Sequence, residues 1–551
     1  MVQDWNKVSP SAVAKVAVQA GREDMAVQEL NPRPGPTVQS AEGLDPRRAY
    51  KTALIANILA AGVLAAWVAK VGYGGNGDAT LHLGTTFQFT DALGRAWVEA
   101  SLDTFLLWFP ERIDLAHPPL GFFIGALCCL LLGKGPAVVL LPNILAYALL
   151  ALPLHRLVRR LSGIGEAWYA VALLPLLPPI AAAMRYCQLD LLLAAWVTLF
   201  FQHFLAPRPG SSLRRRSASL VFIAILGLCT KPAFLLCTVP LVLLVVFAQR
   251  RRHPLLFRTC LVGAGVLGLG GLYFFAPFLS LERWRYHLSP EHFPGAGWAF
   301  QLLFYPWYLL KSWTLLPAML LAAGLYVTLA SRRYRAHRLL LVSLGASLVL
   351  LTAVAQKRSY YLLPCHGLLV VAVAHYLTTF RGEWLRRMVL GLLLCNLALL
   401  STVEGPVTDY LALVTPQDTY YRFHDRLLPP STPFRLPFEQ DLPFVQALTN
   451  SESVVLRHCP PAFARDKPFE FQLRLRFPAL ALRNVDLDAT RNPGSMPRGT
   501  ALYVFPQGFD HPLTLECREQ LALLLPGQCL EKAVHRFWFP GQQQHDVVLV
   551  P

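Results

Sequence analysis

The first residue whose type and place could do chemistry is a carboxylate, Asp78, which follows the first apolar run of the chain. It comes directly after a glycine cluster within residues 74–77, where the backbone can turn sharply. A carboxylate at the edge of a membrane is costly unless it has a partner or a function. Asp78 is therefore either a turn former in a glycine-rich loop or a functional acid.

More polar and ionisable side chains follow in short intervals between later apolar runs. Each has an ordinary explanation: a lysine at a helix end extends its ammonium to water, and a His-Pro-Pro sequence can cap a helix. Their joint placement on one membrane face is harder to obtain by chance. The candidate binding residues are His117, Arg185, Asp190, Lys231, Lys357, Arg358, Tyr360 and Tyr361.

Long apolar segments must position these residues. The chain has 551 residues, of which 54% are hydrophobic and only 15% are charged, a composition too apolar for a soluble protein of this length. We therefore expect an α-helical multi-pass membrane protein, whose segments must each cross about 30 Å of hydrocarbon. The apolar runs cover residues 52–71, 120–132, 136–157, 167–184, 191–206, 220–230, 232–248, 261–279, 313–330, 339–355, 361–379 and 388–403.

Basic residues predict the orientation. The net charge is +17, but Lys and Arg occur in short runs between apolar segments and form no basic stripe, so nucleic acid is not the expected partner. Basic connectors tend to stay in the cytoplasm, and this chain has five, at residues 155–160, 214–216, 250–252, 332–335 and 381–387. If all five do so here, the run at 120–132 cannot be a complete crossing, and the chain has about eleven transmembrane helices. The same parity places Asp78 and the candidate binding residues together on the outer face.

Three regions follow from these patterns. Residues 1–50 predict a disordered cytoplasmic tail, residues 51–404 a transmembrane domain whose first external loop is 72–135, and residues 405–551 a small extracytoplasmic α/β domain. In that last region, alternation predicts a helix at 513–525 and strands near 453–456, 469–475, 500–505 and 546–550. The eleven cysteines show no CxxC pair and no Cys/His spacing, so no metal site is expected.

The order of the polar motifs resembles a known family. Asp78 soon after the first apolar run, followed by His117-Pro118-Pro119-Leu120, is similar to the polyprenol-dependent membrane glycosyltransferases with the GT-C fold. These glycosyltransferase families, 39 and 83, include the protein O-mannosyltransferases and the bacterial aminoarabinose transferases of lipid A. Further motifs at residues 184–190, 228–232 and 356–364 occur in the family's order, and the resemblance covers about residues 50–405.

The resemblance implies transfer of a hexose or pentose from a polyprenyl-phosphate donor to an acceptor hydroxyl, with inversion at the sugar carbon. Such a reaction needs a general base, for which Asp78 is the candidate. The charge of the leaving lipid phosphate must also be held, and Arg185, Lys231, Lys357 and Arg358 are suited to that task in some combination. No cofactor and no obligatory metal are implied.

The implied partners are the polyprenyl-phosphate sugar, membrane lipids and an acceptor that is a protein, a lipid or a glycan. The expected location is a bacterial-type cytoplasmic membrane, with a cytoplasmic N-terminus and a periplasmic C-terminal domain. The family usually has an Asp-Glu pair where this chain has Asp78-Ala79, so a non-catalytic protein of lipid or glycan assembly is the alternative. A transporter is disfavoured because the sequence shows no internal repeat and no ionisable residues near the bilayer midplane.

Overall fold

The computed structural model describes the helical part of the chain and five strands near its C-terminal end. The described residues are 77–99, 119–134, 136–185, 189–206, 212–249, 298–313, 315–330, 335–353, 359–380, isolated positions within 55–62, 382–395 and 446–448, residue 519, and the strands within 453–550. The predicted tail at 1–50, the apolar run at 261–279, the strand at 469–475 and the helix at 513–525 lie outside the described residues, apart from Glu519.

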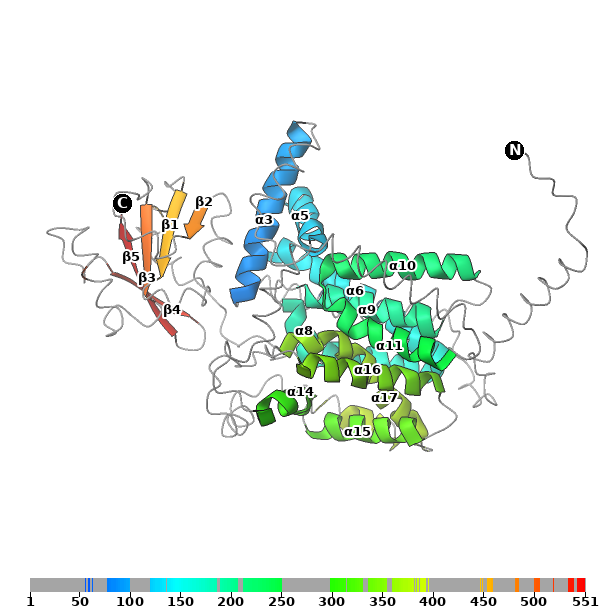
Figure 1. The fold of residues 1–551 in the computed structure, drawn as a ribbon. Coiled ribbons are helices and arrows are strands. Elements are labelled where there is room, and N and C mark those ends of the chain that lie inside the picture. Colours follow the sequence, from blue (N-terminus) through cyan, green and yellow to red (C-terminus); the bar gives the residue numbers. More distant parts are fainter. Residues whose placement is uncertain are drawn as a thin grey trace, which may run out of the picture.

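The described helices form a bundle with two further helices across it (Figure 1). In chain order the elements are α3 (Gly77–Val98), α5 (Leu120–Leu132), α6 (Pro136–Leu161), α7 (Ile164–Leu173), η2 (Leu174–Leu176), α8 (Pro178–Arg185), α9 (Asp190–Leu205), α10 (Leu213–Thr230), α11 (Phe234–Gln249), α14 (Trp298–Trp313), α15 (Leu315–Ala330), α16 (Arg335–Ala353), η4 (Ser359–Leu362) and α17 (Leu363–Thr379).

The bundle is held together by apolar side chains that fill the space between α6, α7, α9, α11, α15, α16 and α17. Small residues let some of these helices approach closely. A Cβ atom added at Gly324 of α15 would collide with the backbone of Ala372 in α17, so glycine at this position permits a close helix contact. The result is a continuous apolar core that fixes the relative positions of the helix ends.

One expected crossing, at residues 167–184, is broken in the structure. It consists of α7, the 3-10 turn η2 and α8 instead of a single helix. Pro175, Pro178 and Pro179 interrupt it, because proline cannot donate the helical hydrogen bond and its ring crowds the preceding turn. Asn143 of α6 then donates from Nδ2 to the carbonyl oxygen of Ala183, 3.1 Å away, and so ties the end of α8 to the bundle.

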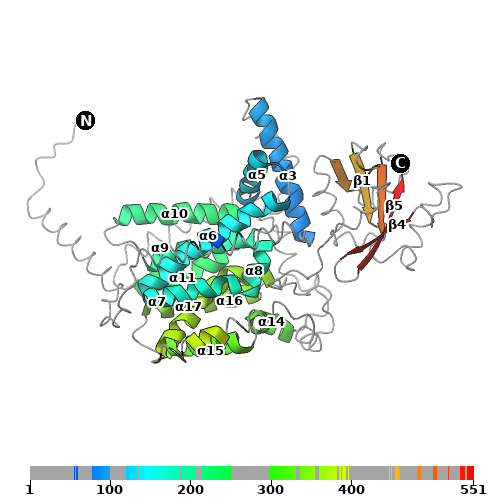
Figure 2. The same ribbon diagram turned by 180° about the vertical axis from the view of Figure 1, so that it is seen from behind.

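Helices α3 and α5 run parallel to each other and stand across the direction of α10 in both views (Figures 1 and 2). The ring of His82 meets that of Phe122, and Thr86 lies against Gly125. That residues 120–132 are not a complete crossing stays a prediction. The structure corrects the expected conformation near Asp78, which lies in the first turn of α3 rather than in a loop. An acidic residue there is favoured by the partial positive charge of a helix N-terminus.

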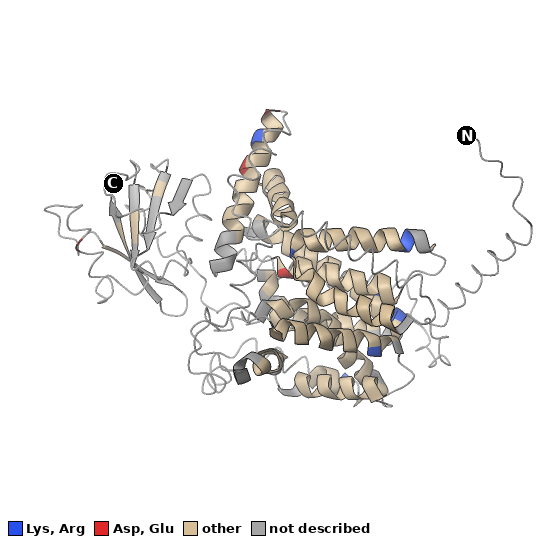
Figure 3. Ribbon diagram, viewed as in Figure 1, with Lys and Arg blue, Asp and Glu red and all other residues tan. Residues whose placement is uncertain are grey.

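The described arginines of the bundle gather at one of its ends (Figure 3). The last turn of α6 carries Arg159 and Arg160, and α10 and α16 begin with arginines. These helix ends meet, since Arg216 Nη2 donates to the carbonyl of Phe204 at the end of α9. We call this the basic end: the last turns of α6 and α9 and the first turns of α10 and α16. The opposite end, where α9 begins, α10 ends and α17 begins, is called the site end.

Two helices, over Leu140–Leu161 and Ala336–Ala353, are long and apolar enough by themselves to cross a membrane. Among the described residues, five further apolar helices are shorter. One expected run, 220–230, is longer than predicted: α10 starts at Leu213, so its three arginines lie in the first helical turn and not in a connector. The number of eleven crossings stays a prediction.

The five strands form one sheet in the order β2-β1-β3-β5-β4. Its members are β1 (Ser453–His458), β2 (Ala481–Asn484), β3 (Thr500–Phe505), β4 (Val534–Phe539) and β5 (Gln543–Val550). β1 pairs in parallel with β2 and β3, whereas β5 pairs antiparallel with β3 and β4. Three expected strands appear as β1, β3 and β5, while β2 and β4 were not expected. In both views the sheet lies apart from the bundle, on the side of α3 (Figures 1 and 2).

Candidate active site

A buried ion pair lies at the site end of the bundle. Lys231 Nζ is 2.8 Å from Asp190 Oδ1, and the two side chains are 7% and 2% exposed. Both residues were predicted to belong to the site from their motifs and their membrane face. Their contact shows that the helices bring these two parts of the chain together.

The local sequence explains where each charge stands. Asp190 is the first residue of α9, and Lys231 directly follows α10. A helix dipole favours an acid at its N-terminus and a cation at its C-terminus, so each charge suits its own helix. Pro232 disfavours helical geometry at Lys231, whose backbone is extended with φ −163° and ψ 133°. Since α9 and α10 are antiparallel neighbours, the two charges meet.

A third predicted residue, Tyr361, joins this pair. The ammonium of Lys231 lies 5.5 Å from the centroid of the Tyr361 ring, within range of a cation–π interaction. Tyr361 belongs to the short 3-10 helix η4, which leads directly into α17. Three segments far apart in the sequence therefore surround one buried cation.

The starts of α3, α5 and α9 also converge. His82, one turn after Asp78 in α3, packs its ring against Phe122 near the start of α5, with 5.5 Å between centroids. Phe122 belongs to one apolar cluster with Phe89 and Leu189, and Leu189 is the residue before Asp190. The backbone of Asp78 thus lies in the first turn of a helix that packs against the residue next to the ion pair.

Other predicted site residues are described only in part. Arg185 ends α8, and Tyr360 lies in η4, but only their backbones are described. The same holds for Asp78. His117, Lys357 and Arg358 lie outside the described residues. Asp190, Lys231 and Tyr361 are accordingly the predicted residues whose side chains the structure brings together.

Four aromatic residues of α14 lie inside the protein. Aromatic residues in such a segment often mark the level of the lipid headgroups, yet Phe304, Tyr305, Tyr308 and Trp313 are all buried. The spacing of Phe304 and Tyr308, four residues apart in a helix, puts both on one face. That face packs against Leu362 and, at its edge, Tyr361, so α14 supports the segment that carries Tyr361.

The sequence pattern did not single out His366, a fully buried residue of α17 that accepts a hydrogen bond from Trp313 Nε1 at 2.8 Å. The sequence feature that could have identified His366 is its position inside an apolar run, close to the predicted outer face. Ionisable residues in such positions are functional candidates by default.

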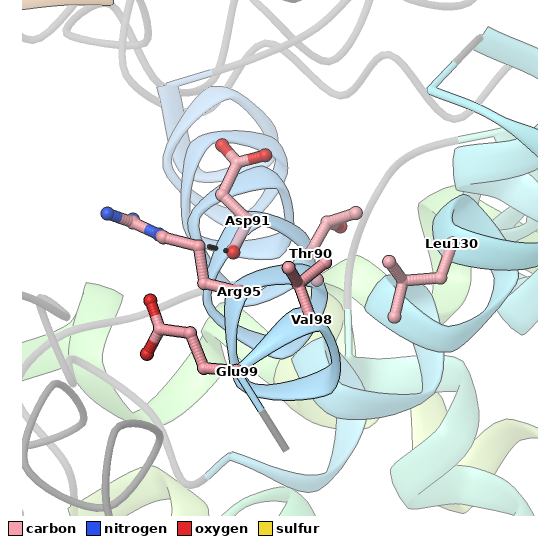
Figure 4. Close-up of a pocket in the computed structure, with 7 residues that line it drawn as sticks. Thr90, Asp91, Arg95, Val98, Glu99 and Leu130 are labelled. Carbon is pink, nitrogen blue, oxygen red and sulfur yellow. Dashed lines mark hydrogen bonds between the residues drawn. The ribbon is translucent and has the colours of Figure 1, made fainter. Parts of the chain in front are cut away.

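A separate cleft of about 560 Å³ runs along α3 (Figure 4). Arg95 and Glu99 extend away from α5, whereas Thr90 and Val98 face Leu130. Asp91, at the rim, is 2.6 Å from Lys134 Nζ. None of the predicted site residues lines this cleft, whose lining residues are Thr90, Asp91, Gly94, Arg95, Val98, Glu99 and Leu130.

Comparison with known proteins defines the class. Residues 116–281 match the model of a family described as Dolichyl-phosphate-mannose-protein mannosyltransferase. This segment contains Arg185, Asp190 and Lys231. The match confirms the resemblance to the polyprenol-dependent membrane glycosyltransferases over that part of the chain. No curated protein matches the chain significantly.

Solved structures show the fold. The chain is similar to ArnT from Cupriavidus metallidurans bound to undecaprenyl phosphate, with a TM-score of 0.57, 16% sequence identity and coverage of 90% of this chain and 97% of that one. It is also similar to ArnT from the same organism in the apo state, with a TM-score of 0.56, 15% identity and coverage of 91% and 98%. The chain is a helical membrane protein with the GT-C fold.

Proposed function

We propose that the chain transfers a sugar from a polyprenyl-phosphate donor to an acceptor hydroxyl at the outer face of the cytoplasmic membrane. The observation that carries the proposal is the buried Lys231–Asp190 pair against Tyr361, built from three distant segments at the site end of the bundle. A structure with the same fold was solved with undecaprenyl phosphate bound, which supports a lipid phosphate as the ligand.

The site end suits the leaving group of such a reaction. An ammonium has three N–H donors, so Lys231 can hold Asp190 and a phosphate oxygen at the same time. Asp190 holds the ammonium in place. Arg185, Lys357 and Arg358 supply further positive charge for the phosphate, while His117, Tyr360 and Tyr361 contact the bound donor.

The chemical step is a single displacement. Asp78 takes the proton of the acceptor hydroxyl, the acceptor oxygen forms a bond to the anomeric carbon, and the bond from that carbon to the phosphate oxygen breaks. Polyprenyl phosphate leaves with the electron pair, and the sugar carbon is inverted. The position of Asp78 in the first turn of α3, which packs next to Asp190, supports this role. The acceptor is a protein, a lipid or a glycan.

The topology of the proposal has a cytoplasmic N-terminal tail and an extracytoplasmic region from residue 405 onward. The gathering of the described arginines of α6 and α10 at the end of the bundle opposite Asp190 supports it, because basic helix ends tend to stay in the cytoplasm.

Transfer of label tests the function directly. Membranes that contain the chain are incubated with polyprenyl-phosphate sugars labelled in the sugar, and label is followed into protein, lipid and glycan fractions. We expect label to be transferred by membranes that contain the wild-type chain and not by membranes that lack it. Binding of undecaprenyl phosphate without transfer of any donor sugar would favour the alternative of a non-catalytic assembly protein, and absence of both would reject the site.

A further inference from the structure

A buried hydrogen bond joins α14 to α17 near the site end. Trp313 Nε1 donates to His366 Nδ1 across 2.8 Å. The two rings are stacked, with centroids 6.2 Å apart and planes inclined by 24°. His366 is 0% exposed and Trp313 2%. This hydrogen bond determines which nitrogen of the His366 ring carries the proton.

The form is set by the donor capacity of tryptophan. An indole N–H can donate but cannot accept, so Nδ1 of His366 must be the acceptor and carry no proton. The neutral ring then carries its proton on Nε2, which becomes a donor. In the described part of the chain, Nε2 is buried and has no hydrogen-bond partner.

A buried donor without an acceptor destabilises the folded state, and native proteins keep few of them. An ordered water is held by about three polar groups. The ring contacts of His366 within the described residues are with Trp313 and Tyr308, the latter at 5.9 Å between centroids. A water bound only to Nε2 of His366 would lack further polar partners. A ligand oxygen that is held in place by other contacts is therefore the better hydrogen-bond acceptor for Nε2–H.

The donor stands close to the residues that surround Lys231. His366 lies in the first turn of α17, five positions after Tyr361. Tyr308, which contacts the His366 ring, belongs to one cluster with Leu362, and Tyr361 packs against the same cluster. The Tyr361 ring in turn faces Lys231.

We propose that His366 is a binding residue of this site, whose Nε2–H donates to an oxygen of the lipid-linked donor, either of the phosphate or of a sugar hydroxyl. Trp313 is a positioning residue that keeps the proton on Nε2. This inference rests on the proposed function and adds to it a neutral donor beside the cations.

Two substitutions separate this role from a purely structural one. In His366→Asn the amide oxygen occupies the place of Nδ1 and still accepts from Trp313, but nothing reaches the place of Nε2. In His366→Gln the amide nitrogen reaches the place of Nε2 and keeps a donor there. We expect the KM for the lipid-linked donor to rise about tenfold or more in the Asn variant, with kcat changed less, and to stay close to wild type in the Gln variant.

The matched control is His203, a partly buried histidine in the last turn of α9 at the basic end, whose Nδ1 contacts the carbonyl of Leu199. Its Asn and Gln variants should keep the wild-type KM. Trp313→Phe keeps a ring but removes the N–H, so it should fall between the two His366 variants.

Undecaprenyl phosphate alone, in nanodiscs, locates the acceptor oxygen. A weaker affinity of the Asn variant for this lipid assigns the phosphate, and a higher KM with unchanged affinity assigns the sugar.

Two results would overturn the proposal. A normal Asn variant with a defective Gln variant would show that only the contact with Trp313 matters, and equal effects of both variants would show that the donor on Nε2 does not matter. If the wild type transfers no sugar, the proposed function is rejected but the inference about His366 is still tested. In that case an affinity for undecaprenyl phosphate that is weaker in the Asn variant than in the Gln variant supports the role of His366, and equal affinities reject it.

Discussion

The two ends of the helical bundle hold their cations in different ways. At the basic end, Arg216 Nη2 donates to the carbonyl of Phe204 at 2.6 Å, and Arg160 donates to the carbonyl of Ala206. Both acceptors belong to the C-terminal end of α9. At the site end, Lys231 contacts a carboxylate side chain and an aromatic ring.

This difference indicates a structural role for the arginines at the basic end and a binding role for Lys231. Carbonyls at a helix C-terminus lack helical partners and carry partial negative charge, so arginines that meet them complete the helix and stay in place. A side-chain carboxylate is a partner that a phosphate can join or replace. The cation at the site end is therefore suited to an exchangeable anion, whereas the arginines at the basic end hold the fold together.

The largest expected effect is an all-or-none difference in thiol labelling, because the two ends of the bundle are proposed to lie on opposite faces of the membrane. A cysteine in place of Ser212, the exposed cap of α10 at the basic end, should be shielded from an impermeant thiol reagent in intact cells and react after permeabilisation. A cysteine in place of Ser451 should react in intact cells. The reverse pattern would invert the proposed topology, and wild-type protein controls for the native thiols.

Asp78→Asn should reduce turnover by about a hundredfold or more, because it preserves shape and removes the general base. Binding of undecaprenyl phosphate should change little. The matched control is Asp91→Asn on the same helix, since Asp91 pairs with Lys134 outside the proposed site. Asp114, three residues before His117 in the predicted first external loop, is the competing candidate for the base. Loss of turnover in Asp114→Asn with a normal Asp78→Asn would show that the base has been misassigned.

Asp190→Asn should destabilise the protein by about 3–5 kcal/mol, the usual cost of leaving one partner of a buried pair alone. Because the ammonium of Lys231 then lacks its carboxylate, undecaprenyl phosphate should raise the melting temperature more in this variant than in wild type. Thermal unfolding in detergent, with and without the lipid, measures both effects. Equal shifts would mean that the phosphate does not meet Lys231.

Lys231→Met should weaken binding of undecaprenyl phosphate by about ten- to a hundredfold, as expected for one charge-assisted hydrogen bond. A double variant that adds Asp190→Asn removes both buried charges, so it should recover stability without recovering affinity. Recovery of affinity in the double variant would contradict a direct role for the ammonium.

The smallest effect is expected at the basic end. Arg216→Met removes the hydrogen bond to Phe204 and should cost about 1 kcal/mol of stability, with unchanged affinity for undecaprenyl phosphate and unchanged turnover. A loss of affinity as large as that of Lys231→Met would remove the distinction between the two ends.

Local sequence determined much of this protein. Apolar runs specify the helices of the bundle, and the helix over 120–132 has the expected bounds. The parity of the basic connectors, which is an electrostatic property of short segments, predicts that this helix is not a complete crossing, and that stays a prediction. Asp190, Lys231 and Tyr361 were selected by motif order and by their predicted membrane face, and their side chains do meet.

Tertiary structure decided which groups touch. Lys231 and Asp190 are 41 residues apart, and Trp313 and His366 are 53 apart; no local rule selects these partners. The aromatic residues of α14 show the same limit, because an amphipathic aromatic run suits a lipid interface and a protein core equally well. Only the packing of α14 against η4 and α17 places them inside, and the tautomer of His366 follows from that packing.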